Sequence, residues 1–100
     1  MPLRPYFTDM FDLTGFRRDL LYVIASDDGQ HGLAIKDKIE TYYETEINHG
    51  RLYPNLDVLV EKGLIEKSKR DDRTNEYDLT ARGAREIEAR MEWEQQYVDR

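Results

Sequence analysis

Cysteine is absent from the 100 residues, which excludes disulfides, thiolate nucleophiles and cysteine-ligated zinc. The two histidines, His31 and His49, stand far apart and lack the H-E-x-x-H spacing of a helical zinc site. No phosphate-binding G-x-x-x-x-G-K motif and no recognisable pair of nucleophile and base occurs. The sequence therefore predicts a protein that is not an enzyme and uses no metal and no cofactor.

Long apolar runs are also missing. No segment approaches the roughly 20 residues that a membrane helix needs, and residues 1–13 lack the apolar segment of a secretory signal. We expect a cytoplasmic protein with no membrane partner. A chain of 100 residues fits one domain with a modest core, and so small a core favours a homodimer.

Basic residues are fewer than acidic residues. The chain has 21 acidic and 15 basic residues, a formal net charge of −6. So acidic a protein is repelled by nucleic acid at long range. Any DNA-binding surface must therefore be a local concentration of basic residues.

Apolar residues recur with helical spacing in three short segments, after an amphipathic arm that contains Tyr6, Phe7, Met10 and Phe11. Thr14 is placed to cap the first helix, and Gly63 to end the third, which runs from about Arg51 to Lys62. The apolar stripes are Phe16, Leu20, Val23 and Ile24; then Ile35, Ile39 and either Tyr42 or Tyr43; then Leu52, Leu56, Leu59 and Val60.

From Leu64 the apolar period changes from helical to two. Residues 64–70 and 75–80 predict a small β-hairpin, and Ala81 to about Val98 a last helix. This order predicts a mainly α fold with a small β-hairpin (α+β), a winged helix-turn-helix whose third helix reads DNA and whose hairpin is the wing. We expect an N-terminal arm at 1–13, the DNA-binding domain at 14–80 and a C-terminal dimerisation helix at 81–100.

The third helix has an unusual start. Pro54 is tolerated near a helix N-terminus, where the first amides have no acceptor within the helix. Arg51 suits a bidentate contact to guanine, and Asn48 or Asn55 a contact to adenine. The predicted DNA-binding residues of this segment are Asn48, His49, Gly50, Arg51, Tyr53, Pro54 and Asn55. In the alternative interpretation Asn48 is only a cap, Gly50 only a turn and Arg51 a solvated charge.

The stretch from Lys62 to Arg73 is locally basic, with five basic and three acidic residues. A wing of this charge is expected to contact the DNA backbone or an adjacent minor groove. The alternative is a solvated hairpin with ion pairs to Glu66, Asp71 and Asp72. The predicted contacts are Lys67, Lys69, Arg70, Arg73, Thr74 and Asn75 in the wing, with Lys36 and Lys38 of the second helix added on the backbone.

Three stretches resemble the PadR-like family of winged-helix transcriptional regulators: "HGLAIKDKIE", "HGRLYPNLDVLVEKGLIEK" and "RTNEYDLTARG". The likeness covers roughly residues 14–91, with the Leu52-Tyr53-Pro54 triplet in the recognition helix. The charge pattern resembles halophilic archaeal members, the oxidative-stress regulator among them. The resemblance implies a DNA-binding regulator. Many relatives continue into several further helices, so we expect no large effector-binding C-terminal domain.

The last helix has an apolar side without an evident partner in its own domain. Two copies packed together, closed by Phe7 and Phe11 of the arm, would bury it and suit a pseudo-palindromic site. In the alternative, Trp93 and Tyr97 fold back on their own domain. The predicted interface comprises Phe7, Phe11, Ala84, Ile87, Met91, Trp93, Tyr97 and Val98.

Strong acidity also indicates a protein of concentrated salt, where the Debye length falls to about 3 Å at 1 M. Acidic residues near the DNA are then expected to hold cations in the interface, which makes bound cations a predicted partner beside double-stranded DNA. The sequence as a whole predicts a sequence-specific transcriptional regulator, and the resemblance implies a response to stress. The alternative function is a winged-helix module for protein–protein interaction.

Overall fold

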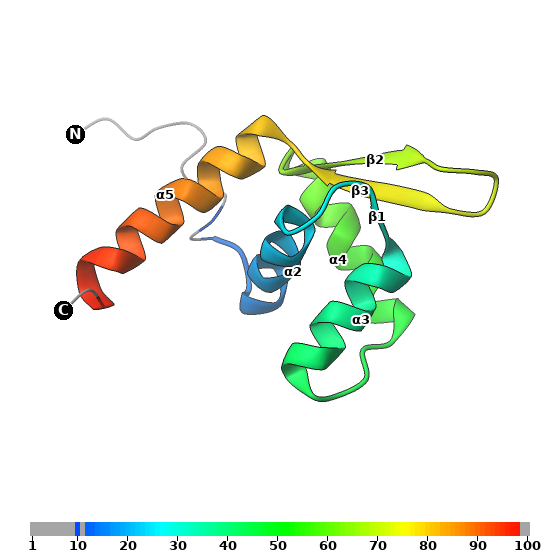
Figure 1. The fold of residues 1–100 in the computed structure, drawn as a ribbon, viewed down its shortest axis with the longest axis horizontal. Coiled ribbons are helices and arrows are strands. Elements are labelled where there is room, and N and C mark those ends of the chain that lie inside the picture. The colour runs from blue at the N-terminus through cyan, green and yellow to red at the C-terminus, as the bar shows by residue number, and fades with distance from the viewer. Residues whose placement is uncertain (1–9, 11, 99–100) are drawn as a thin grey trace.

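The computed structural model describes residues 10 and 12–98 (Figure 1). The predicted order of three helices, a hairpin and a last helix is confirmed, and the fold is a winged helix. A short strand before the second helix joins the hairpin. The elements are α2 (Gly15–Ala25), β1 (Gln30–His31), α3 (Gly32–Tyr43), α4 (His49–Glu61), β2 (Ile65–Lys69), β3 (Asn75–Leu79) and α5 (Ala81–Val98).

The sheet has three antiparallel strands in the order β1-β3-β2, one strand more than the predicted hairpin. Gln30 of β1 pairs with Tyr77 of β3. The Gln30 side chain is 4% exposed, and its amide donates to the carbonyls of Val23, at 2.8 Å, and Asp27, at 3.1 Å. These bonds attach the sheet to the C-terminal end of α2. A strand of two residues has no period, which is why the sequence did not reveal it.

The core lies between α2, α3, α4 and the inner face of the sheet. The predicted stripes of the first three helices are buried, apart from Val23 and Val60, which are half-buried. Tyr43 packs on the core while Tyr42 is 76% exposed, which decides between the two tyrosines. The buried apolar residues are Met10, Leu13, Phe16, Leu20, Leu21, Ile24, Ile35, Ile39, Ile47, Leu52, Leu56, Leu59, Leu64, Ile65, Tyr77 and Ile87.

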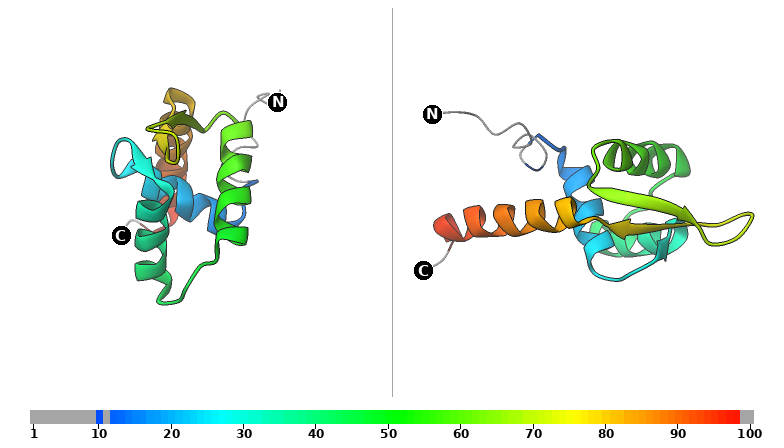
Figure 2. Two further views of the ribbon diagram at one scale, coloured as in Figure 1. Left: turned by 90° about the vertical axis from the view of Figure 1, so that its right-hand side faces the viewer. Right: turned by 90° about the horizontal axis from the view of Figure 1, so that it is seen from above.

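Helix α5 extends away from the domain, in the direction opposite to the wing (Figure 2). Its start is fixed by Thr80, whose hydroxyl lies 2.7 Å from the Gly63 carbonyl and 3.0 Å from the Leu64 carbonyl. The same hydroxyl accepts a hydrogen bond from the Gly83 amide. A methyl group at Gly83 would overlap the Leu64 carbonyl, so only glycine allows this close approach. No helix in the described part of the chain is both long and apolar enough to cross a membrane.

Candidate nucleic-acid interface

The exposed end of α4 begins at His49, two residues before the predicted start. Asn48 is the N-cap, and its side-chain oxygen accepts a hydrogen bond from the Arg51 amide at 2.8 Å. The side-chain carbonyl oxygen of Asn48 is thus used in capping the helix. His49, Gly50, Arg51 and Pro54 are exposed, so the first two turns of α4 present a continuous surface to solvent.

On one side, this surface is bordered by the first turn of α2. The Arg51 guanidinium lies over the Phe16 ring, 4.0 Å from its centroid. One turn further along α4, the Asn55 side-chain oxygen accepts from Arg17 Nε at 2.7 Å, and the Asn55 nitrogen donates to the Arg51 carbonyl at 2.7 Å. Arg51 is therefore not a simple solvated charge, and both ends of the Asn55 amide are occupied.

Tyr53 faces the other way, toward the start of α3. A methyl group at Gly32 would overlap its ring and hydroxyl, so glycine is required for the two helices to pack this closely. The His49 ring meets Tyr53 edge-on, with 5.5 Å between ring centroids. Gly32 of the "HGLAIKDKIE" stretch and Tyr53 of the Leu52-Tyr53-Pro54 triplet thus form one contact between α3 and α4.

A hollow of about 240 Å³ lies between the start of α3, Tyr53 and the tip of the wing. It brings together predicted DNA-binding residues that are far apart in sequence. Leu33, which is 56% exposed, was not predicted as a site residue. The lining residues are His31, Gly32, Leu33, Tyr53, Arg73, Thr74, Asn75 and Tyr77.

The basic side chains of the wing are loosely held. Lys67 Nζ lies 3.6 Å from Asp57 of α4, and Arg70 Nε lies 3.4 Å from Glu76 of β3. These partners are not the acidic residues of the turn that the alternative interpretation named. Exposed pairs of this kind contribute about 0–1 kcal/mol, so phosphate groups can replace them at little cost.

The wing turn itself is ordered by one carboxylate. Asp71 accepts a hydrogen bond from the Arg73 amide at 2.9 Å, and this bond is the main reason that the pKa of Asp71 lies below its usual value. A charged Asp71 therefore shapes the turn through the backbone amide of Arg73.

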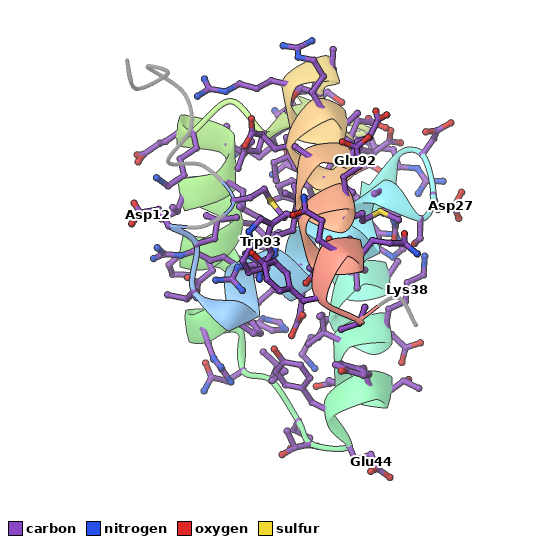
Figure 3. The ribbon with its side chains drawn as sticks, turned by 90° about the vertical axis from the view of Figure 1, so that its left-hand side faces the viewer. Asp12, Asp27, Lys38, Glu44, Glu92 and Trp93 are labelled. Atoms are coloured by element: carbon purple, nitrogen blue, oxygen red, sulfur yellow. The ribbon has the colours of Figure 1, made fainter. Side chains whose placement is uncertain are left out.

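The two lysines of α3 have local partners. Lys36 Nζ donates to Glu40 at 2.8 Å, and the same carboxylate accepts from the Ile47 amide at 2.8 Å; these two bonds lower the pKa of Glu40, with the lysine contributing most. Lys38 Nζ donates to Gln30 at 2.8 Å. Figure 3 places Lys38 on the side of α3 that faces away from α4. Its contact with DNA stays a prediction that no neighbouring element supports.

Most residues of the predicted dimer surface lie in the described part of the chain. Met91, Trp93 and Tyr97 are 54%, 50% and 67% exposed, so the two aromatic residues do not fold into their own domain. Arg90 lies over the Trp93 ring, 4.8 Å from its centroid. Ala84 and Val98 are also exposed, whereas Ile87 packs into the core of its own domain. The predicted contacts of Phe7 and Phe11 lie outside the described residues.

An exposed helix between the wing and a second helix is the arrangement that defines the class of winged-helix DNA-binding regulators. Residues 20–89 match the profile of the Transcriptional regulator PadR-like family. The chain belongs to this family, as its motifs predicted. No match was found among curated proteins.

Solved structures agree with this assignment. RosR of H. salinarum, in crystals grown from NaBr, is 49% identical, with a TM-score of 0.85, over 92% of this chain and 84% of that one. The complex structure of hsRosR-S4 is 48% identical, with a TM-score of 0.87, over 95% and 83%. F93 from STIV, a winged-helix DNA-binding protein, is 20% identical, with a TM-score of 0.68, over 87% and 96%, and supports the fold alone.

Proposed function

We propose that this protein is a sequence-specific transcriptional regulator that binds a pseudo-palindromic DNA site as a homodimer. Helix α4 enters the major groove, and the wing contacts the backbone or the adjacent minor groove. The observation that carries this proposal is the exposed start of α4, with Arg51 on it, between the first turn of α2 and the wing. Residues 14–80 bind DNA, residues 81–100 pair the two copies and the arm around Phe7 and Phe11 closes the seam.

The homodimer is supported by the outer half of α5. Met91, Trp93, Tyr97 and Val98 are all at least half exposed, and a second copy would bury them. A two-fold axis through this surface gives two copies of α4 that read two half-sites, about 34–36 Å apart when the half-sites are one turn apart.

Acidic residues lie on the DNA side of the molecule as well. Asp57 and Glu61 are both exposed on α4, one turn apart. Next to phosphates they need counter-ions, so we propose that cations stay bound between α4 and the DNA. Function in concentrated salt follows from the net charge of −6. A role in a stress response rests on the resemblance to the halophilic members of the family alone.

The test is selection of a preferred site from random duplexes, followed by titration with variants. Arg51→Ala is expected to lose about 1–3 kcal/mol for the preferred site, because a base contact is removed. Arg73→Ala should weaken all duplexes alike and flatten the salt dependence, because it removes a phosphate contact. Arg85→Ala on α5 is the control for loss of charge.

Two results would contradict the proposal. A wild-type protein that binds no duplex at any salt concentration points to the protein-interaction module instead. Unchanged binding by both the Arg51 and the Arg73 variant would place the DNA on another surface.

A further inference from the structure

Two neighbouring residues of α2, Phe16 and Arg17, contact two residues of α4 that lie one turn apart. Phe16 is under the Arg51 guanidinium, and Arg17 holds Asn55. Neither α2 residue belongs to the recognition helix. Arg17 lies 38 positions before Asn55 in the chain, so the fold alone brings them together.

The stacking of Arg51 leaves its hydrogen-bonding capacity intact. A guanidinium that lies on an aromatic ring uses its face, while its five N–H donors point outward in the plane. The Phe16 ring itself packs against the Tyr43 ring, with 6.0 Å between the ring centroids. Tyr43 is fixed by its hydroxyl, which donates to Asp19 at 2.6 Å. The ring under Arg51 is therefore held in place from α3.

Asn55 already uses both ends of its side-chain amide within the protein. Its oxygen accepts from Arg17, and its nitrogen donates to the carbonyl of Arg51. These two bonds link the backbone of the turn that carries Arg51 to the side chain of Arg17. The two bonds fix the orientation of the Asn55 amide, which is what a positioning role requires.

We propose that Phe16 and Arg17 are positioning residues for base recognition by Arg51, with Asn55 as the link between Arg17 and α4. This inference rests on the proposed function. Phe16 limits the orientations of the guanidinium, and Arg17 fixes the turn from which it extends. Preorganised donors lose less conformational entropy on binding, and a fixed geometry penalises the wrong base. Base preference at the position read by Arg51 thus depends on two residues that contact no base.

The experiment measures base preference, defined as the ratio of dissociation constants between the preferred duplex and duplexes changed at one position. Loss of preference in Arg51→Ala identifies the position that Arg51 reads. At that position Phe16→Leu and Arg17→Met should each lower the preference about threefold or more, a fraction of what one bidentate contact provides. Phe16→Tyr keeps the ring and should restore the preference. Arg85→Met removes a charge from α5 and should leave it unchanged.

A measurement without DNA separates positioning from a direct contact. In ¹⁵N spectra of the free protein, the side-chain amide signal of Asn55 should move in Arg17→Met and not in Arg85→Met. Thermal unfolding shows whether Phe16→Leu is folded at the temperature of titration. Arg17 is only half-buried, so Arg17→Met is expected to remain folded.

The possible outcomes distinguish failure of this inference from failure of the proposed function. If Phe16→Leu and Arg17→Met weaken all duplexes by the same factor, or leave the preference intact while Arg51→Ala abolishes it, the inference is wrong and the proposed function stands. If the wild-type protein prefers no sequence, both are wrong.

Discussion

The start of α4 and the wing, the two surfaces proposed to contact DNA, are held in different ways. Around the start of α4, side chains make short hydrogen bonds of 2.7–2.8 Å through Asn48, Asn55 and Arg17. In the wing, the ion pairs of Lys67 and Arg70 are 3.6 and 3.4 Å long and exposed. A fixed surface suits discrimination among bases, and a loose one suits phosphates, which are the same in every sequence. The comparison predicts that selectivity comes from α4 and general affinity from the wing.

The largest expected effect is on the packing that holds α4. Gly32→Ala should lower the free energy of unfolding by about 1–3 kcal/mol, because the added methyl group displaces Tyr53. Urea denaturation measures it. Gly15→Ala is the matched control, since nothing lies within 4 Å of the added methyl group. Equal destabilisation by the two variants would mean that Tyr53 does not hold α3 against α4.

A smaller effect is expected at the N-cap of α4. Asn48→Ala should cost about 1 kcal/mol of unfolding free energy, because the Arg51 amide loses its acceptor. Asn48→Ser should retain most of the stability, because serine also caps helices. If serine is no better than alanine in urea denaturation, the Asn48 side chain does not stabilise the helix start.

The ion pair between α4 and the wing tests the loose side of the comparison. Asp57→Asn should change the free energy of unfolding by only about 0–1 kcal/mol. It should strengthen DNA binding at low salt, because it removes a negative charge and releases Lys67. Glu61→Gln removes the same charge without releasing this lysine and should strengthen binding less. Titrations of one duplex compare them, and equal gains would show that the ion pair does not restrain Lys67.

The smallest expected effect is a slope at high pH. Burial, followed by the hydrogen bond to Asp19, raises the pKa of Tyr43 from 10.0 to about 12. Between these values the folded protein binds more protons than the unfolded chain, so stability falls as pH rises. Tyr43→Phe should reduce this fall, and Tyr42→Phe at the exposed neighbour should not. Thermal unfolding between pH 9 and about 12 measures it; parallel curves for all three proteins would contradict the assignment.

Periodicity predicted most of the fold. Buried apolar residues repeat within each helix, and alternation marks the hairpin, so local pattern placed these elements. The start of α4 was misplaced by two residues because His49 and Gly50 precede the first apolar residue of the stripe. Gln30 in β1 carried no signal, since its burial depends on carbonyls at the end of α2.

The candidate site was predicted less completely. Motif residues such as Arg51 and Tyr53 do lie on the exposed end of α4 or beside it. Phe16 was predicted only as core, and Arg17 was not predicted at all, because their contacts cross from one helix to another and follow no local spacing. Neighbouring basic residues in the first turn of α2 were the only available hint.

The position of Thr80 has a mechanical meaning. One hydroxyl joins the beginning of α5 to the two residues, Gly63 and Leu64, that connect α4 to β2. Because Gly83 has no side chain, the start of α5 packs directly against the Leu64 carbonyl. In the proposed homodimer, a rotation of α5 is therefore expected to move the segment that joins α4 to the hairpin.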